Sequence, residues 1–133
     1  MKAVFLDTVG LIAVWDLADQ WHGGAEPVFL QLVTSGTPIL TTTLVLYECG
    51  NAAARRPYRT AVDDLRVWLA AKGWLIEPTA SDLDQAWADY RAGNASTAGI
   101  VDHVSFQVMR RLAMTEAFTN DKHFQAAGFT VLF

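Results

Sequence analysis

Short, continuous apolar runs alternate along this chain with longer segments in which apolar residues recur every three or four positions. The short runs are typical of buried strands, and we predict strands over 2–7, 39–42, 74–78, 116–120 and 129–133. The longer segments have helical spacing, and we predict helices over 9–18, 28–36, 42–56, 58–73, 82–92, 100–114 and 121–128. Because strands that alternate with helices form βα units, we expect an α/β fold with a mostly parallel sheet.

Local signals refine two of these helices. Pro57 disfavours the helical conformation at the residue before it, so the third helix should end near Arg56. The helix over 82–92 needs a side chain that caps its first turn, and Thr79, Ser81 and Asp82 are all candidates.

The composition favours one compact domain. The chain has 133 residues, of which 52% are hydrophobic and 18% are charged, and we predict a single domain over 1–133 with one buried core. The apolar run after Lys2 is broken by Asp7, which makes it too short for a signal peptide or a membrane span, so we expect no membrane association. The lone cysteine, Cys49, excludes an internal disulfide and suits a reducing cytoplasm, where we expect it to be a small buried residue.

The charge distribution leaves the kind of partner open. A formal net charge of −4 argues against binding of nucleic acid by bulk electrostatics. Four arginines nevertheless fall in one short stretch: Arg55, Arg56, Arg59 and Arg66. If acidic residues of the chain held divalent cations, the local field near them would also change sign.

Acidic residues follow two of the predicted strands. In an open α/β sheet, ligands bind beyond the carboxyl ends of the strands, which is where the sequence places Asp7 and Asp121. Each has an ordinary structural alternative, because Asp7 could cap the next helix and Asp121 could cap a helix or stabilise a turn. Asp102, near the start of its helix, could likewise cap it or complement its dipole.

Glu48 is harder to explain as a structural residue. The helix from Leu44 to Cys49 is apolar in every direction except at this glutamate, so we predict no solvated face for its carboxylate. Unpaired burial of a carboxylate costs several kcal/mol, and such a group is normally paired or bound to a metal. The remaining alternative is an exposed or salt-bridged Glu48.

Four acids gathered in one pocket would need a cation, because ionised carboxylates repel one another. An all-oxygen cluster favours Mg²⁺ or Mn²⁺ over Zn²⁺, and the chain has no Cys/His set with zinc-ligand spacing. Such a site suits hydrolysis of phosphodiesters, in which the metal activates water and neutralises charge on the phosphoryl group.

Four motifs in this order resemble the PIN-domain family, and in particular the VapC-type toxins of toxin–antitoxin pairs: "VFLDT", "LYECGNAAARR", "IVDHVSFQVMRR" and "AFTNDKHFQAAGF". The resemblance covers essentially the whole chain and implies a three-layer fold with a central, mostly parallel sheet of four or five short strands. It implies endoribonuclease activity with Mg²⁺ or Mn²⁺. The catalytic, metal-binding acids would be Asp7, Glu48, Asp102 and Asp121. Ser105 matches a hydroxyl of the family's site, and Thr8 and Asn120 are expected to support the ligands.

The resemblance also implies partners. We expect an RNA substrate, a small cognate antitoxin protein that wraps the toxin, and a homodimer. Arg55, Arg56 and Arg59 would then contact RNA phosphates or an acidic segment of the antitoxin, with a merely solvated helix end as the alternative.

One departure from the family pattern precedes the third acid. Gly99 stands where these toxins often carry a serine, and we interpret it as a change of loop geometry or hydrogen bonding. It motivates the main alternative, a PIN-like domain that binds RNA or a protein without cutting. A metal-dependent phosphatase is disfavoured, because the "DTVG" segment lacks a second aspartate two places after Asp7.

Neither histidine of the C-terminal half is required as a base. His103 is adjacent to Asp102 on a helix, where neighbouring side chains point about 100° apart, so we predict that it faces away from the acids. We predict a structural role for His123, such as a hydrogen bond to the loop over 94–99.

Overall fold

A computed structural model describes all residues 1–133 and has a five-stranded, all-parallel sheet at its centre. The strand order is β3-β2-β1-β4-β5, and β1 pairs with β2 at Val4–Ile39 and with β4 at Val4–Glu116. The strands are β1 (Val4–Leu6), β2 (Ile39–Thr42), β3 (Leu75–Ile76), β4 (Glu116–Phe118) and β5 (Thr130–Val131). The predicted α/β class and parallel sheet are confirmed, although the paired segments are shorter than the apolar runs.

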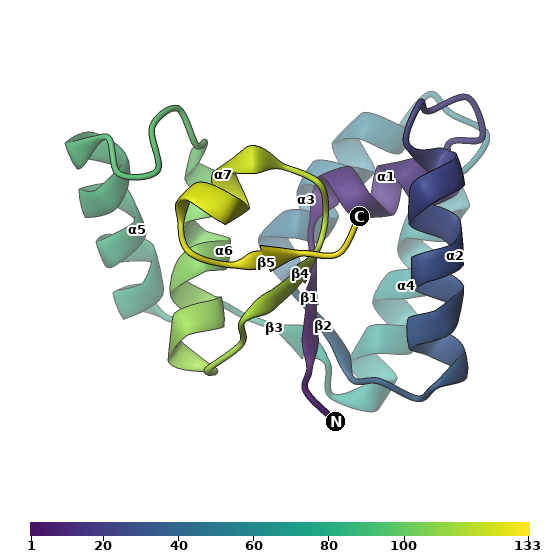
Figure 1. The fold of residues 1–133 in the computed structure, drawn as a ribbon, viewed down its shortest axis with the longest axis horizontal. Coiled ribbons are helices and arrows are strands. Elements are labelled where there is room, and N and C mark those ends of the chain that lie inside the picture. Colours follow the sequence, from purple (N-terminus) through teal and green to yellow (C-terminus); the bar gives the residue numbers. More distant parts are fainter.

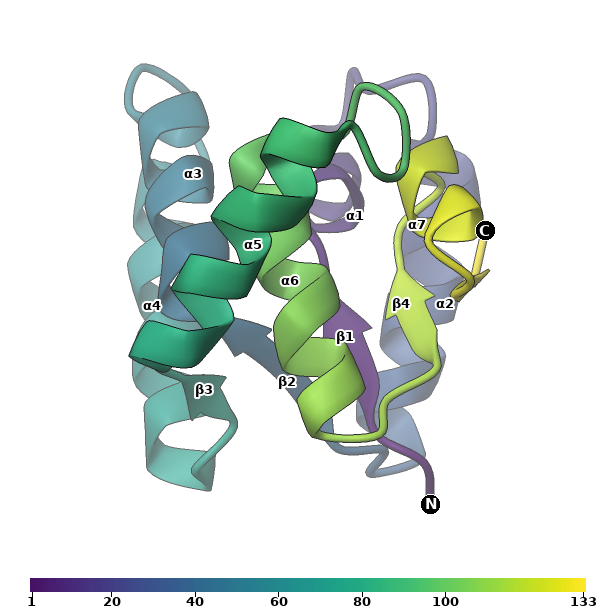
Figure 2. The same ribbon diagram turned by 90° about the vertical axis from the view of Figure 1, so that its left-hand side faces the viewer.

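Seven helices cover both faces of the sheet (Figure 1). In Figure 1, α5 and α6 lie together to the left of the strands, while α1 and α2 pack against each other on the right. Figure 2, in which the left-hand side of Figure 1 faces the viewer, shows α5 packed beside α6, with β1 and β4 on the other side of α6. The helices are α1 (Thr8–Trp15), α2 (His22–Thr34), α3 (Thr43–Ala53), α4 (Arg59–Lys72), α5 (Ala80–Ala92), α6 (Ile100–Arg111) and α7 (Lys122–Ala126).

The predicted start of α2 at residue 28 is wrong, because the helix begins at His22. Two glycines and Pro27 discouraged a helix there, but tertiary contacts outweigh these local preferences. The His22 Nδ1 atom lies 2.8 Å from the carbonyl oxygen of Ala13, which fixes the helix start to α1. Ala25, in the second turn, is completely buried.

Helix ends elsewhere follow the capping chemistry. Thr79 caps α5 in a capping box, in which its hydroxyl accepts from the Asp82 amide and its own amide donates to the Asp82 carboxylate. Thr42 caps α3, since its hydroxyl accepts from the amide of Val45. Helix α6 ends at Arg111, earlier than predicted.

The main core lies between the sheet and its helices and is rich in phenylalanine. Phe118 of β4 packs against Phe29 of α2 with ring centroids 5.5 Å apart. Phe106 of α6 meets Phe124 of α7 edge to face at 4.9 Å. These contacts fasten α2, α6 and α7 around the central strands, so the loops at the carboxyl end of the sheet rest on a rigid base.

Gly10 allows α1 to lie unusually close to β4. A Cβ atom at this position would stand 2.1 Å from the carbonyl oxygen of Phe118, far inside van der Waals contact. Because α1 begins directly after β1, this close approach holds the first turn of α1 against the end of β4. It therefore brings the residues that follow the two central strands together.

None of the seven helices has the combination of length and apolar character that a membrane span requires.

Candidate active site

Asp7 is the deepest acid of the cluster. It follows β1 at the start of α1, with 1% of its surface exposed. Its side chain makes no capping bond to the helix, so the predicted capping alternative is wrong. Instead Oδ2 accepts a hydrogen bond from the Thr119 hydroxyl at 2.8 Å. Burial, and then the neighbouring Asp102 and Asp121 charges, raise the pKa of Asp7 to about 8 despite that bond.

Thr119 is a member of the site that the sequence analysis missed. It is completely buried directly after β4. Its hydroxyl donates to Asp7 and accepts from the backbone amide of Asp121 at 3.1 Å. The signal in the sequence was a hydroxyl residue between an apolar strand and an acid, in "AFTND".

Asp102 stands in the first turn of α6, facing the ends of the strands. It does not cap the helix, because Gly99 occupies the N-cap position. Its carboxyl is half-buried. Burial, and then the nearby Asp121 and Glu48 charges, raise the pKa of Asp102 to about 6.

Asp121 has both a structural role and a place in the cluster. Its carboxylate caps α7 by accepting from the amide of His123 at 2.9 Å, as the structural alternative predicted. The His123 Nδ1 atom lies 2.8 Å from the same oxygen, and its Nε2 atom lies 3.0 Å from the hydroxyl of Thr97. The predicted bond from His123 to the loop over 94–99 is therefore confirmed.

His123 is nevertheless closer to the acids than its predicted structural role implied. Asp102, Asp121 and His123 each offer one ligand atom, and these atoms lie within 4.8 Å of one another. A cation at this point would have an imidazole nitrogen within reach as well as carboxylate oxygens.

The predicted burial of Glu48 is wrong. Glu48 is exposed, and its neighbour Tyr47 exposes 67% of its surface, so α3 does have a solvated face here. The apolar residues around Glu48 predicted burial, but the flank of α3 that carries Tyr47 and Glu48 is open to solvent. The side chain still turns toward the acids, since the Thr8 hydroxyl donates to Oε1 of Glu48 at 2.5 Å. Thr8 thus contacts one of the acids, as expected.

Other predicted residues have different outcomes. The Ser105 hydroxyl donates to the carbonyl of Val101 in its own helix at 3.0 Å, and the structure shows no hydrogen bond from it or from Asn120 to an acid. His103 is buried between Tyr90 and Phe106 and faces away from the acids, as predicted. Cys49 is buried as expected, and this burial raises its thiol pKa to about 12.

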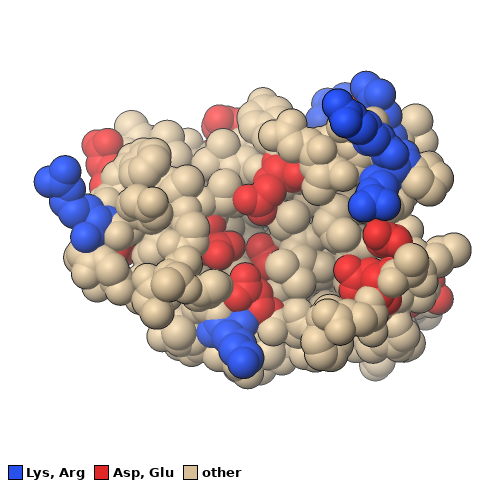
Figure 3. All heavy atoms as spheres, turned by 90° about the horizontal axis from the view of Figure 1, so that it is seen from above, with Lys and Arg blue, Asp and Glu red and all other residues tan.

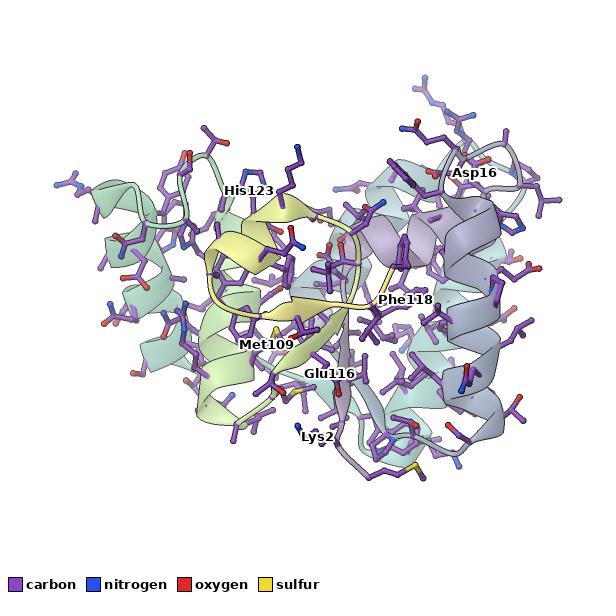
Figure 4. The ribbon with its side chains drawn as sticks, viewed as in Figure 1. Lys2, Asp16, Met109, Glu116, Phe118 and His123 are labelled. Carbon is purple, nitrogen blue, oxygen red and sulfur yellow. The ribbon has the colours of Figure 1, made fainter.

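The surface above the sheet is hollowed and acidic at its centre. Figure 3 shows red side chains gathered in the middle of this face, with a blue group of Lys and Arg side chains at one edge. Arg55 and Arg56 are exposed in the turn between α3 and α4, and Arg59 is exposed at the start of α4. His123 and Asp16, labelled in Figure 4, both lie at this end of the molecule.

The chain is similar over nearly its whole length to a known toxin. It is 30% identical over 132 residues to the 23S rRNA-specific endonuclease VapC20 of Mycobacterium tuberculosis, covering 95% of each protein. The crystal structure of VapC20, described as a Sarcin-Ricin loop cleaving toxin, matches with a TM-score of 0.80 at 28% identity and covers 96% of each chain. No protein-family model matches the chain.

Two further structures share the fold at lower identity. FitAB bound to the IR36 DNA fragment matches with a TM-score of 0.69 at 16% identity, covering 96% of this chain and 92% of the other. VapBC2 from Rickettsia felis, bound to a DNA fragment from its promoter, matches at 0.62 and 15%, covering 98% and 97%. The fold is thus that of the PIN-like α/β proteins. By its likeness to VapC20, the chain belongs to the VapC family of toxins.

Proposed function

We propose that this protein is a divalent-metal-dependent endoribonuclease and the toxin of a toxin–antitoxin pair. The observation that carries the proposal is the gathering of acids at the carboxyl end of the sheet. Asp102 and Asp121 offer ligand atoms within 4.8 Å of each other, and their charges contribute to the raised pKa of Asp7. The acids are Asp7, Glu48, Asp102 and Asp121. The likeness to VapC20, which is named as an endonuclease specific for 23S rRNA, supports RNA as the substrate class.

The donor set fits Mg²⁺ or Mn²⁺. Asp7 and Asp102 both have raised pKa values because their carboxyls are desolvated and crowded by like charge. A divalent cation would relieve that repulsion, and oxygen-rich sites select Mg²⁺ or Mn²⁺. The four acids would hold it, with His123 close by. The ion would supply charge neutralisation at the phosphate and would favour attack by water.

The chain's own residues would position these ligands. Thr119 fixes one oxygen of Asp7 and the backbone of Asp121. Thr8 fixes one oxygen of Glu48. Both hydroxyls act as donors to carboxylates, so they would hold the ligands in place and leave the remaining oxygens for the ion.

The partners follow from the family. The protein would bind a small antitoxin in the cytoplasm, act as a homodimer and contact RNA phosphates through Arg55, Arg56 and Arg59.

The alternative function, a PIN-like domain that binds without cutting, was motivated by Gly99, and the backbone at Gly99 gives it little support. Gly99 has ordinary extended backbone, with φ −76° and ψ 171°, and its carbonyl accepts the first helical bond of α6 from His103.

Cleavage of RNA by the purified protein in Mg²⁺ or Mn²⁺ tests the proposal. Asp7→Asn and Asp102→Asn should each abolish cleavage and leave the fold intact. Asp84→Asn is a matched control, because Asp84 is an exposed acid on α5. Full activity in both site variants, or activity that persists in excess chelator, would refute the metal-site assignment.

A further inference from the structure

A second hollow lies at the same end of the molecule as the acids. It has a volume of about 440 Å³ and is formed where the connection after α1 meets the turn between α3 and α4. Its walls come from Trp15, Asp16, Arg56, Pro57 and Tyr58, with Leu17 and Ala18 at the side. None of these residues takes part in the acid cluster.

Two aromatic rings form one wall. Trp15 and Tyr58 are half-buried and stack with their ring centroids 6.3 Å apart and an interplanar angle of 23°. Burial, and then the Asp16 carboxylate, raise the pKa of the Tyr58 phenol, so the hydroxyl stays protonated at neutral pH and can donate a hydrogen bond. A flat aromatic wall with hydrogen-bonding groups at its rim suits a planar heterocycle.

The hollow lies within reach of an RNA strand held at the acids. Helix α1 begins at Thr8, which contacts Glu48, and ends at Trp15. Seven residues of helix rise about 10 Å, a distance of roughly three stacked nucleotides. Figure 4 shows Asp16, at the end of α1, and His123 at the same end of the molecule.

Positive charge borders this hollow on the side of the α3–α4 turn. Arg56 lines it, and Arg55 and Arg59 are exposed next to it in the sequence. Figure 3 shows a group of Lys and Arg side chains at one edge of this face, whose centre is acidic. Phosphates of a single strand could be neutralised by the arginines while one base enters the hollow, which is the combination that single-strand-binding surfaces use.

We propose that the hollow lined by Trp15 and Tyr58 is a nucleobase subsite for RNA, separate from the acids that carry the chemistry. One unpaired base would stack on the aromatic wall, and Arg56 would contact the adjoining phosphate. This inference rests on the proposed function, since it assumes that RNA crosses this face. It assigns to α1 a second role, because its first turn supports the acids and its last residue contacts the substrate.

Binding of RNA to protein that cannot cut tests the subsite. The full-length Asp7→Asn variant would be titrated into a fluorescein-labelled, single-stranded RNA of about 12 nucleotides, within the usual footprint of such surfaces. Trp15→Leu and Tyr58→Leu should each weaken the affinity roughly 5- to 100-fold, the range expected for loss of one stacked base. Trp15→Phe should recover most of the loss, because it keeps an aromatic face.

The matched control is Trp87→Leu, which removes a 54% exposed tryptophan from α5, outside the hollow. It should change the affinity less than twofold. RNAs that lack one base at a time add a readout that a merely structural role would not move. For the protein with Trp15 intact, removal of the base at one position of the RNA should weaken the affinity. For Trp15→Leu, the same abasic RNA should bind as well as the complete RNA, because the contact is already lost.

Equal RNA affinity of the Trp15, Tyr58 and Trp87 variants would overturn the subsite. If the Trp15 and Tyr58 variants kept their RNA affinity but bound the antitoxin more weakly, the hollow would be a contact for a protein partner instead. Parallel cleavage assays in protein with Asp7 intact separate the two proposals. If RNA is cut but the three variants bind alike, only the subsite fails. If the protein neither cuts nor binds RNA, both proposals fall.

Discussion

The hydroxyl of Thr119 donates a hydrogen bond to the carboxylate of Asp7 across 112 residues of sequence, with a donor–acceptor distance of 2.8 Å. The same hydroxyl accepts from the amide of Asp121. One threonine therefore links the acids that follow the two central strands, and it does so where no solvent reaches.

Thr119→Val should disrupt this link with little change in side-chain volume. The variant leaves the Asp121 amide and an Asp7 oxygen without their partner, which should cost about 1–2 kcal/mol of unfolding free energy. The pKa of Asp7 should rise further, because the bond now lowers it, and Mn²⁺ affinity should fall. Urea unfolding and calorimetric Mn²⁺ titration measure both effects. Thr119→Ser, which keeps the hydroxyl, is the control, and a Val variant equal to wild type would argue against the link.

Stability without metal should fall as the pH rises from about 6.5 to 8. The pKa of Asp7 is near 8 in the folded protein, so in this window the folded state keeps a proton that the unfolded chain has released. Asp102, with a pKa of about 6, adds to the loss mainly at lower pH. Buried His103 has a lowered pKa and acts in the opposite direction, mostly below its ordinary value of 6.5.

Urea unfolding in chelator at several pH values measures this slope. The slope should flatten in Asp7→Asn, which has no proton to lose, and saturating Mg²⁺ should flatten it in wild type because the cation displaces the proton. A wild-type protein whose stability is constant or rises across this window would contradict the crowding of charge at Asp7.

Gly10→Ala should be strongly destabilising. The new Cβ would stand 2.1 Å from the carbonyl oxygen of Phe118, so α1 must move away from β4. We expect a loss of about 3 kcal/mol or more in unfolding free energy, together with weaker metal binding. Gly50→Ala on α3 is the matched control, because a Cβ there meets no atom within 4 Å. It should stabilise the helix by up to about 1 kcal/mol; similar behaviour of the two variants would refute the close approach.

Much of the site could be predicted from the sequence because parallel strands end at one edge of a sheet. That rule predicts that Asp7 and Asp121 lie close together. The environment of Glu48, which lies on a helix, could not be predicted in this way. The apolar letters around it predicted burial, but whether a helix flank is covered depends on packing against distant segments, which local pattern does not record.

Thr119 and Gly10 could not be predicted for a related reason. Their roles depend on contacts across more than 100 residues, with Asp7 and with the backbone of Phe118. A threonine after a strand and a glycine in a helix each have many ordinary explanations. Likewise, the start of α2 is set by the His22 contact with Ala13, which outweighs nearby glycines and a proline.

Gly99→Ser tests whether the departure from the family pattern affects only the helix start. Gly99 is the N-cap of α6, makes no side-chain capping bond and has room for a side chain. Serine should cap the helix and raise stability by a few tenths of a kcal/mol, while Gly99→Ala should not. Thermal unfolding measures the gain. RNA cleavage should stay within about twofold of wild type, and a large loss of activity in Gly99→Ser would show that the site requires glycine.

Calorimetric titration of Mn²⁺ tests the central claim, that the four gathered acids form one divalent-metal site. Wild type and Asp84→Asn should bind at millimolar metal or below, with an affinity that increases with pH as protons leave Asp7 and Asp102. Asp7→Asn and Asp102→Asn should bind at least tenfold more weakly, and Glu48→Gln should lose metal affinity while keeping its unfolding free energy. Absence of binding by wild type, or wild-type affinity in all three site variants, would contradict the account.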